Sequence, residues 1–302
     1  MILKNFDTVF ELARSAASKK HVVVAGAESM NAVGGGFECA KHELATPIFV
    51  GQEKRFRQLV EEGGWSGLPY EFVACEEGED AGEKAVSLVA GGHGDCLMKG
   101  SVETADFLRP LVSRKFGLRG DGTLSLVSLA EVPGYDRLLA FSDPAILPFP
   151  DMEQRIQMVN NAVSLLHKLG VECPNVALLS ALEVVSKAIP DTAESMEMVE
   201  RWKGGEMPGC NLAGPISYDL MMSKEAAEVK GYDCPWCGEF DAVICPNIVV
   251  ANVLGKVLSV SAHSRQAGIV AGAKVPAVLT SRSMSADDRL AAMAFALAVS
   301  NG

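Results

Sequence analysis

The chain has 302 residues, of which 48% are hydrophobic and 22% are charged, as is ordinary for a globular enzyme. This length corresponds to roughly two domains of ~150 residues each. The formal net charge of -11 and the lack of any run of Lys or Arg argue against a nucleic-acid-binding surface. If the substrate is anionic, cations must be concentrated locally against this negative background.

The N-terminal stretch "MILKNFDTVFELARSAASKKHVVVAG" predicts an amphipathic helix followed by a strand. It does not resemble a signal peptide, because charges interrupt its apolar residues and no cleavage pattern follows. The longest apolar run, near 290–299, has about ten residues and is too short to span a bilayer. We therefore expect a soluble, cytoplasmic protein with no membrane partner.

Short apolar, β-branched runs alternate with helical patterns along most of the chain, which predicts an α/β protein with mostly parallel sheets. The strands expected from these runs are His21–Ala25, Thr46–Val50, Glu71–Ala74, Cys96–Met98, Leu124–Leu129, Leu138–Phe141, Val176–Ser180, Asn211–Gly214, Ala242–Cys245 and Ala277–Leu279. The clearest helix is Asp151–Leu169, which Asp151 and Gln154 begin with a capping box. A second helix, Asp191–Lys203, is predicted to repeat this device with Asp191 and Glu194.

Two domains follow from the segment "SDPAILPFPDM" (142–152), which has three prolines in seven residues between a strand and a long helix. We expect a first domain of residues 1–143 plus 280–302 and a second of residues 144–279. The segment after 280 is one helix, too little for a domain of its own, so it should pack on the first domain. That arrangement would place "TSRSMSADDR" (280–289) at an interdomain cleft, where ligand sites are favoured.

Several familiar motifs are absent from the sequence. The stretch "AGAESMNAVGGG" (25–36) lacks the GxGxxG spacing, and "GDCLMKGS" (94–101) lacks the P-loop spacing. No His has ligand-like spacing, so we expect no metal site. Of eight cysteines, only Cys234 and Cys237 have a suggestive CxxC spacing, and the strand follows them instead of preceding them. We expect reduced cysteines without a functional role.

Cations and polar groups lie where predicted strands end and helices begin. In "LMKGSVETADFLRPLV" (97–112), Lys99, Thr104 and Arg109 surround a helix N-terminus that could hold an oxyanion, although a capped helix with solvated cations is an equal alternative. Tyr218, with Asp219, begins a helix after "GPIS". Asn252 and Lys256 follow the strand that ends at "CPN". Asn252 and Lys256 could contact a polar ligand, or they could simply lie on the exposed face of a capped helix.

The stretch "TSRSMSADDR" contains Ser285 and Asp288 at the spacing of a helix cap, a device worth ~1 kcal/mol. A cap does not explain Arg282, because a cation beside a helix N-terminus is repelled by the helix dipole. The arginine is better explained if an anion binds between it and the helix.

In this order, the pieces resemble the phosphate acetyl/butyryl transferase family. The matching segments, which span about 20 to 300, are "KGSVETADFLRPLV", "VALLSALEVVSKAIPDT", "GPISYDLMMSKEAAEVKG", "PNIVVANVLGK" and "AGIVAGAKVPAVLTSRSMSADDR". "SALEVVSKAIPDT" and "LTSRSMSADD" are nearer the butyryl members. Acetyl members place an Arg at the position of Val260, and the family usually has a Gly at that of Ala251; these departures speak against the acetyl interpretation and against the family's usual pocket shape.

The resemblance implies reversible transfer of a short acyl group: acyl-CoA and phosphate give acyl phosphate and CoA. It implies two α/β domains similar to isocitrate dehydrogenase and isopropylmalate dehydrogenase, with the active site in the interdomain cleft. Coenzyme A is then a substrate, and we expect no tightly bound cofactor and a homodimer or higher homo-oligomer. By position, Asp288 matches the acid that takes the CoA thiol proton, Arg282 and Ser281 match the phosphate and transition-state partners, and Arg109 matches a pocket arginine.

Chemistry is consistent with these roles. A thiol of pKa ~8.5 must become a thiolate to attack, and a carboxylate base assists this step. Arg282 suits a bidentate contact with phosphate, and Ser281 suits an oxyanion. Three alternatives remain open: a phosphate acetyltransferase, a non-catalytic acyl-CoA or acyl-phosphate binding protein, and a dehydrogenase of the same fold class. The last would need a nicotinamide site and a carboxylate cluster, and the sequence displays neither.

Overall fold

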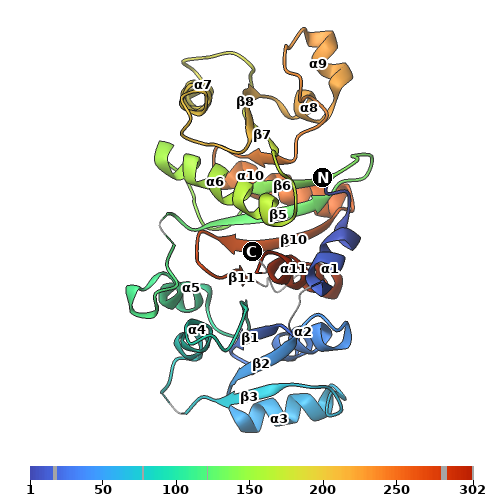
Figure 1. Ribbon diagram of the computed structural model, residues 1–302, viewed down its shortest axis with the longest axis vertical. Coiled ribbons are helices and arrows are strands. Elements are labelled where there is room, and N and C mark those ends of the chain that lie inside the picture. Colours follow the sequence, from blue (N-terminus) through green and yellow to red (C-terminus); the bar gives the residue numbers. More distant parts are fainter. Residues whose placement is uncertain (16–18, 77, 121, 280–283, 301–302) are drawn as a thin grey trace. The chain divides into compact units, whose positions relative to one another are not determined.

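The computed structural model describes residues 1–15, 19–76, 78–120, 122–279 and 284–300. The chain forms two compact units, each of which combines segments that are distant in sequence. Unit 1 consists of residues 1–6 and 122–266, and unit 2 consists of residues 7–121 and 267–302. Helices alternate with strands in both units (Figure 1), which confirms the predicted α/β class.

Unit 2 contains the N-terminal run of elements and the C-terminal helix. Helix α1 (Phe6–Arg14) begins at the border between the units, and strand β10 (Arg265–Ala271) crosses it. The other elements are β1 (His21–Ala25), α2 (Met30–Lys41), β2 (Thr46–Gly51), α3 (Glu53–Glu62), β3 (Glu71–Ala74), α4 (Ala81–Ala90), β4 (Cys96–Lys99), α5 (Thr104–Val112), the 3₁₀ turn η1 (Arg114–Phe116), β11 (Ala277–Val278) and α11 (Ala286–Val299).

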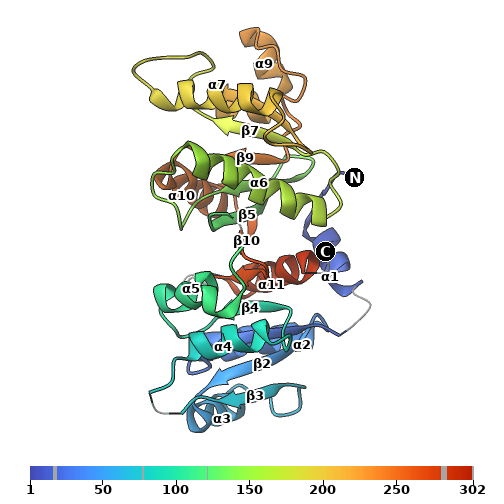
Figure 2. The ribbon, with the colours of Figure 1, turned by 60° about the vertical axis from the view of Figure 1, so that its left-hand side comes forward.

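The strands of unit 2 form a parallel arrangement in the order β3, β2, β1, β4, β11. Val23 of β1 lies opposite Ile48 on one side and Leu97 on the other, and β10 pairs with β11 in the antiparallel sense. Helix α4 covers one face, and α2 and α11 cover the other (Figures 1 and 2). Burial on both faces explains why β1 and β2 are almost continuously apolar.

Unit 1 contains the remaining strands and helices. They are β5 (Ser125–Glu131), β6 (Leu138–Ser142), α6 (Met152–Lys168), β7 (Asn175–Leu179), α7 (Pro190–Lys203), β8 (Asn211–Ile216), α8 (Tyr218–Met222), α9 (Lys224–Lys230), β9 (Ala242–Ile244), α10 (Ile248–Lys256) and the π-helical turn η2 (Val257–Ser261). Strands β5 and β6 pair in the antiparallel sense, and β6, β9, β7 and β8 follow in parallel order.

The sheet of unit 1 is also covered on both faces. Ala177 and Leu179 of β7 belong to one core cluster with Leu220 of α8 and Ala251 of α10. Because side chains alternate along a strand, Val176 and Leu178 point to the opposite face, which α6 and α7 cover (Figure 2). Because β6, β9, β7 and β8 are parallel, their carboxyl ends lie along one edge of this sheet.

The two predicted capping boxes have different outcomes. Asp151 and Gln154 form the box at the start of α6, as predicted. The box predicted from Asp191 and Glu194 is wrong, because α7 begins one residue earlier at Pro190 and Ile189 is its N-cap. Asp191 accepts a hydrogen bond from Ser180 Oγ at 2.6 Å, and Glu194 pairs with Arg155 at 3.0 Å. Both carboxylates thus bind side chains of other elements and do not cap α7.

The borders of the units differ from the predicted domain borders at 143/144 and 279/280. Strand β6 pairs with β9, which keeps β5 and β6 in unit 1, and β11 pairs with β4, which keeps Ala277 and Val278 in unit 2. Strand β10 was not predicted at all. Its sequence, "RQAGIVA", contains a central Gly and begins with two polar residues, so its apolar run is short.

Candidate functional site

The carboxyl edge of the unit 2 strands holds the first group of predicted site residues. Strand β4 ends at Lys99, whose Nζ donates hydrogen bonds to the carbonyl oxygens of Val102 at 2.8 Å and Gly100 at 3.4 Å. Lys99 therefore lies folded over the turn that follows its own strand. Its ammonium group is half-buried at the place where β4 passes into the segment leading to α5.

Two glycines let the turns after β1 and β4 approach each other. A Cβ on Gly100 would contact the carbonyl oxygen of Gly26 and lie 2.6 Å from that of Ala25, so no larger residue fits without a backbone shift. Gly26 itself has φ of 84°, which is accessible to glycine at little cost. The amides of Gly100 and Ser101 then donate to Ala25 and Gly26 at 2.9 Å each.

Glu28 and Ser101 tie the ends of three neighbouring strands. Ser101 Oγ lies 2.6 Å from Glu28 Oε2 and 2.7 Å from the carbonyl oxygen of Gly26, and it accepts from the Glu28 amide at 3.2 Å. The other carboxylate oxygen of Glu28 accepts from the amide of Gln52, which follows β2, at 3.0 Å. Sequence reasoning missed this role of Glu28, because its partners are distant in sequence.

Helix α5 carries Thr104 and Arg109, which were predicted to contact substrate. Thr104 is the first residue of the helix and is exposed, and the side chain of the N-cap residue Glu103 makes no capping hydrogen bond. Arg109 is exposed and pairs with Asp106 of the same helix. Both residues are thus accessible to a ligand, and the Arg109 pair is of the weak surface kind.

Helix α11 begins with the predicted Ser285 cap. Ser285 Oγ accepts from the Asp288 amide at 3.0 Å and donates to Asp288 Oδ2 at 2.7 Å. The carboxylate therefore bonds the cap hydroxyl, where a full capping box would use the cap amide. Ser281 and Arg282, the other two predicted catalytic residues, lie outside the described residues.

Arg289, which the sequence analysis passed over, follows Asp288 and is 9% exposed. Its two Nη atoms donate to the carbonyl oxygens of Met284 at 3.3 Å and Asn31 at 3.4 Å. Its Nε has no hydrogen-bond partner among the described residues, and burial lowers the pKa of the guanidinium. This arginine links the start of α11 to the first turn of α2.

Unit 1 holds the other predicted residues at the carboxyl ends of β8 and β9. Asn247 caps α10 by accepting from the Val250 amide at 3.1 Å. Asn252 is exposed and donates to the carbonyl oxygen of Pro144 at 3.2 Å, whereas Lys256 is exposed on the last turn of α10. Tyr218 begins α8, and its partial burial raises the pKa of the phenol, so the hydroxyl is a neutral donor.

A cluster of four polar side chains includes both sequence neighbours of Tyr218. The carboxylate of Glu183, which follows β7, accepts from Ser217 Oγ and lies 3.4 Å from Lys230 Nζ. Asp219 lies 2.6 Å from Ser217 Oγ and 3.0 Å from Lys230 Nζ. The Ser217 hydroxyl and the Lys230 ammonium lower the pKa of Asp219 to about 2. Asp219 alone looked like a helix cap in the sequence, and Glu183 gave no signal.

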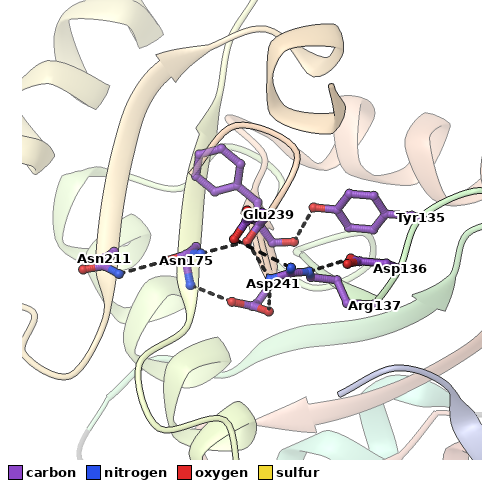
Figure 3. Close-up of polar contacts among 8 residues, drawn as sticks. Tyr135, Asp136, Arg137, Asn175, Asn211, Glu239 and Asp241 are labelled. Carbon is purple, nitrogen blue, oxygen red and sulfur yellow. Dashed lines mark hydrogen bonds and ion pairs between the residues drawn. The ribbon is translucent and has the colours of Figure 1, made fainter. Parts of the chain in front are cut away.

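A second polar network lies at the opposite, amino edge of the same strands (Figure 3). Arg137 is buried and contacts Asp136 at 2.9 Å, Asp241 at 3.4 Å and the carbonyl oxygen of Glu239 at 3.0 Å. Asp241 accepts from the amide of Asn175 at 2.8 Å. These groups satisfy one another and the backbone, which is typical of a structural network.

All eight cysteines belong to the described residues and are free thiols. Cys234 is half-buried and Cys237 is buried, and burial raises the pKa of both, to about 12 for Cys237. A raised pKa disfavours the thiolate that redox chemistry and metal binding require.

Across the described parts of the chain, no three His, Cys, Asp or Glu side chains are grouped to hold a metal ion. Likewise, none of the described helices combines the length and the apolar character that crossing a membrane requires.

Known proteins resemble almost the whole chain. Residues 70–297 match the model of the family described as phosphate acetyl/butaryl transferase. A phosphate butyryltransferase of Clostridium beijerinckii is 33% identical, over 98% of this chain and 98% of its own. A phosphate acetyltransferase of Thermotoga maritima is 33% identical, over 95% of this chain and 97% of its own. A solved branched-chain phosphotransacylase from Enterococcus faecalis has a TM-score of 0.83 at 28% identity, over 93% of this chain and 99% of that one.

Proposed function

The chain belongs to the phosphate acetyl/butyryl transferase family, and from this premise we propose that it transfers a short acyl group reversibly between coenzyme A and inorganic phosphate. The observation that carries the proposal is the position of Asp288 in the first turn of α11, where Ser285 holds its carboxylate. Asp288 and Arg282, which lies six residues earlier in the sequence, are the base and the cation that this reaction needs.

The proposed reaction has a nucleophile at each end. In one direction the thiol of CoA gives its proton to Asp288, the thiolate attacks the carbonyl carbon of the acyl phosphate, and the carbon–oxygen bond to phosphate breaks. In the other direction phosphate attacks the thioester, and the leaving thiolate takes the proton back from Asp288. Arg282 neutralises the phosphate, and Ser281 donates to the oxyanion of the tetrahedral intermediate. Because both nucleophiles are competent, no covalent acyl-enzyme is required.

The remaining candidates are proposed as substrate contacts for phosphate or CoA. They are Lys99, Thr104 and Arg109 in unit 2, and Tyr218, Asn252 and Lys256 in unit 1. Thr104, Arg109, Asn252 and Lys256 are exposed, which supports a role in ligand binding. Lys99 is half-buried against backbone carbonyl groups, so a bound anion would have to compete with these.

The acyl group is proposed to be butyryl or similar. Matching relatives are named for butyryl and for acetyl transfer, so phosphate acetyltransferase activity is the alternative. A non-catalytic binding protein is a weaker alternative, because such a protein would have no use for the Asp288 carboxylate. We further propose that CoA acts only as a substrate, with no tightly bound cofactor, and that the protein is a cytoplasmic homodimer or higher homo-oligomer.

The direct test is CoA release from a panel of acyl-CoA thioesters, from acetyl to hexanoyl, with and without phosphate. We expect release that depends on phosphate and is fastest for a chain longer than acetyl. Fastest release from acetyl-CoA would favour the acetyltransferase alternative. No phosphate-dependent release with any thioester, from a protein that still binds acyl-CoA, would favour the binding protein.

A further inference from the structure

Two valines in the loop that joins β7 to α7 face solvent. Val184, which follows Glu183 directly, is 66% exposed, and Val185 is 54% exposed. Tyr218, which is 36% exposed, follows Ser217 directly. Because the Glu183 carboxylate accepts a hydrogen bond from Ser217 Oγ, the residues that follow these two lie at the same edge of the sheet. We define Val184, Val185 and Tyr218 as the apolar patch.

Hydrogen bonds hold the loop on both sides of the valines. On one side, Glu183 is bound to Ser217 and lies 3.4 Å from Lys230 Nζ. On the other, the Ser186 amide donates to Thr192 Oγ1 at 2.9 Å, and Thr192 is fully buried. A surface that is already fixed loses little conformational freedom when a ligand binds. The valines are therefore presented to solvent by a preorganised loop.

The patch lies where an α/β sheet binds ligands. Strands β7 and β8 are parallel neighbours, the valine loop follows the carboxyl end of β7, and Tyr218 follows the carboxyl end of β8. Ligands of open α/β sheets bind outside the carboxyl ends of the strands. The neutral hydroxyl of Tyr218 also supplies a hydrogen-bond donor at the border of an otherwise hydrocarbon surface.

We propose that the apolar patch binds the hydrocarbon part of the acyl group and selects saturated chains longer than acetyl. This inference rests on the proposed acyl transfer. The patch itself carries no charge, and the adjacent carboxylates of Glu183 and Asp219 disfavour a phosphate at this position, so the substrate contact proposed for Tyr218 is with acyl-CoA. Three side chains are also far fewer than the ~20–30 residues that each partner contributes to a stable protein interface. An aliphatic chain of a few carbons matches both the chemistry and the size.

The expected effect follows from the transfer of methylene groups out of water. Each methylene that the patch buries should raise kcat/KM roughly fourfold, which corresponds to ~0.8 kcal/mol. A butyryl chain has two methylenes more than acetyl, so a working patch should favour it by about fifteenfold.

The test is the double variant Val184→Ser/Val185→Ser, assayed with acetyl-, propionyl-, butyryl- and hexanoyl-CoA. We expect the ratio of kcat/KM for butyryl-CoA to that for acetyl-CoA to fall by about fifteenfold, with little change in the KM for phosphate. The control is Val229→Ser on α9, because Val229 is 88% exposed and lies in the same unit. Its ratio should equal that of the wild type.

A second pair of variants tests the loop anchor. Glu183→Ala removes the acceptor for Ser217 Oγ and should reduce the same ratio, whereas Glu183→Gln keeps a carbonyl acceptor and should restore most of it. A merely structural role of Glu183 would lower activity with all thioesters equally and leave the ratio unchanged.

The outcomes separate this inference from the proposed function. If the wild type transfers no acyl group at all, the proposed function fails. If it is active but the double variant keeps the wild-type ratio, the patch does not bind the chain and this inference is overturned. An unchanged ratio together with a shift in size-exclusion elution would instead make the patch an interface between copies.

Discussion

The two edges of each sheet use carboxylates in different ways. At the amino edge, Asp95 precedes β4 and accepts from the amide of His21 at 2.7 Å, while its own amide donates to the His21 carbonyl oxygen at 2.9 Å. Asp241 precedes β9 and forms the same pair of bonds with Asn175, each of 2.8 Å. At the carboxyl edge, Asp219 and Asp288 bond to hydroxyl groups of Ser217 and Ser285.

The difference separates structural carboxylates from those available for chemistry. A carboxylate that accepts from backbone amides is bound to the fold, whereas one that accepts from a serine hydroxyl can exchange this partner for a substrate. Position alone does not decide the matter. Asp143 lies at the carboxyl end of β6, yet it accepts from the amides of Leu126, Ala145 and Ile146 and is buried. It belongs with the structural group.

The largest effect is expected for Asp288→Asn. If Asp288 takes the thiol proton, the variant should fold normally and lose on the order of 10²–10⁴ in kcat. The amide still occupies the third position of α11, so the loss of stability should stay below ~1 kcal/mol. The loss of rate should shrink as the pH approaches the CoA thiol pKa of ~8.5, where solvent supplies the thiolate.

The matched control for this prediction is Asp287→Asn, which removes an exposed carboxylate from the same turn. Its kcat should remain within about twofold of the wild-type value, because surface charges alter local chemistry little. A well-folded Asp288→Asn variant with near-normal rates at pH 7 would show that Asp288 only stabilises the start of α11. It would also contradict the distinction between the carboxylates at the two edges.

The second effect concerns the amino edge, where Asp241→Ala should destabilise the protein without changing the chemistry. The variant removes the Asp241 carboxylate from the buried guanidinium of Arg137, which keeps Asp136 and the Glu239 carbonyl oxygen, and it takes the side-chain acceptor from the Asn175 amide, at a cost of about 3 kcal/mol. Urea unfolding should detect this loss, while kcat/KM of the folded variant stays near that of the wild type. Glu239→Gln is the control, because Glu239 is exposed and lies 3.9 Å from Arg137. Equal losses of unfolding free energy in both variants would contradict the idea that burial makes the Asp241 contacts more stabilising than those of Glu239.

Local patterns predicted much of the fold. The parallel strands of unit 2 were found to within one or two residues, because buried parallel strands such as "HVVVA" form apolar runs that contrast with their neighbours. The cap of α6 was found because its two partners, Asp151 and Gln154, are only three residues apart. Strand β10 and the borders of the units depend on pairings such as that between Val270 and Ala277, which no local pattern encodes.

The candidate site was predicted in part for the same reason. Ser285 and Asp288 interact within one helical turn, and that spacing is visible in the sequence. Other contacts at the sheet edge join residues that lie far apart in the chain, and no pattern in the sequence indicated them. They are the contacts of Glu28 with Ser101 and of Glu183 with Ser217. Arg289 gave no signal, because its partners Met284 and Asn31 are backbone carbonyl groups.

A smaller effect should follow from Gly100→Ala at the carboxyl edge of unit 2. The added Cβ would contact the backbone of Gly26 and Ala25, which cannot move as a flexible side chain would. We expect a loss of about 2 kcal/mol in the free energy of unfolding, typical of overpacking. Gly67→Ala is the control, because its Cβ would meet nothing within 4 Å. If the Gly100→Ala variant has the wild-type free energy of unfolding in urea titrations, the two turns can move apart without loss of stability.

The smallest effect is expected for the exposed carboxylate of Asp219, and it depends on pH. Its pKa in the folded protein is about 2, below the ordinary value of 3.8, because the Ser217 hydroxyl and the Lys230 ammonium favour the ionised form. A depressed folded pKa contributes stability above the unfolded pKa, and this stability is lost as the pH falls from about 4 towards 2. Asp219→Asn should therefore lower the Tm slightly at pH 6, and the difference should vanish near pH 2. Salt should reduce this Tm difference, because the pair with Lys230 is exposed.

The control for the Asp219 prediction is Asp233→Asn, which removes another exposed aspartate of unit 1. A Tm difference that is independent of pH would mean that Asp219 stabilises α8 by shape and hydrogen bonding alone, and that its charge is free for a substrate.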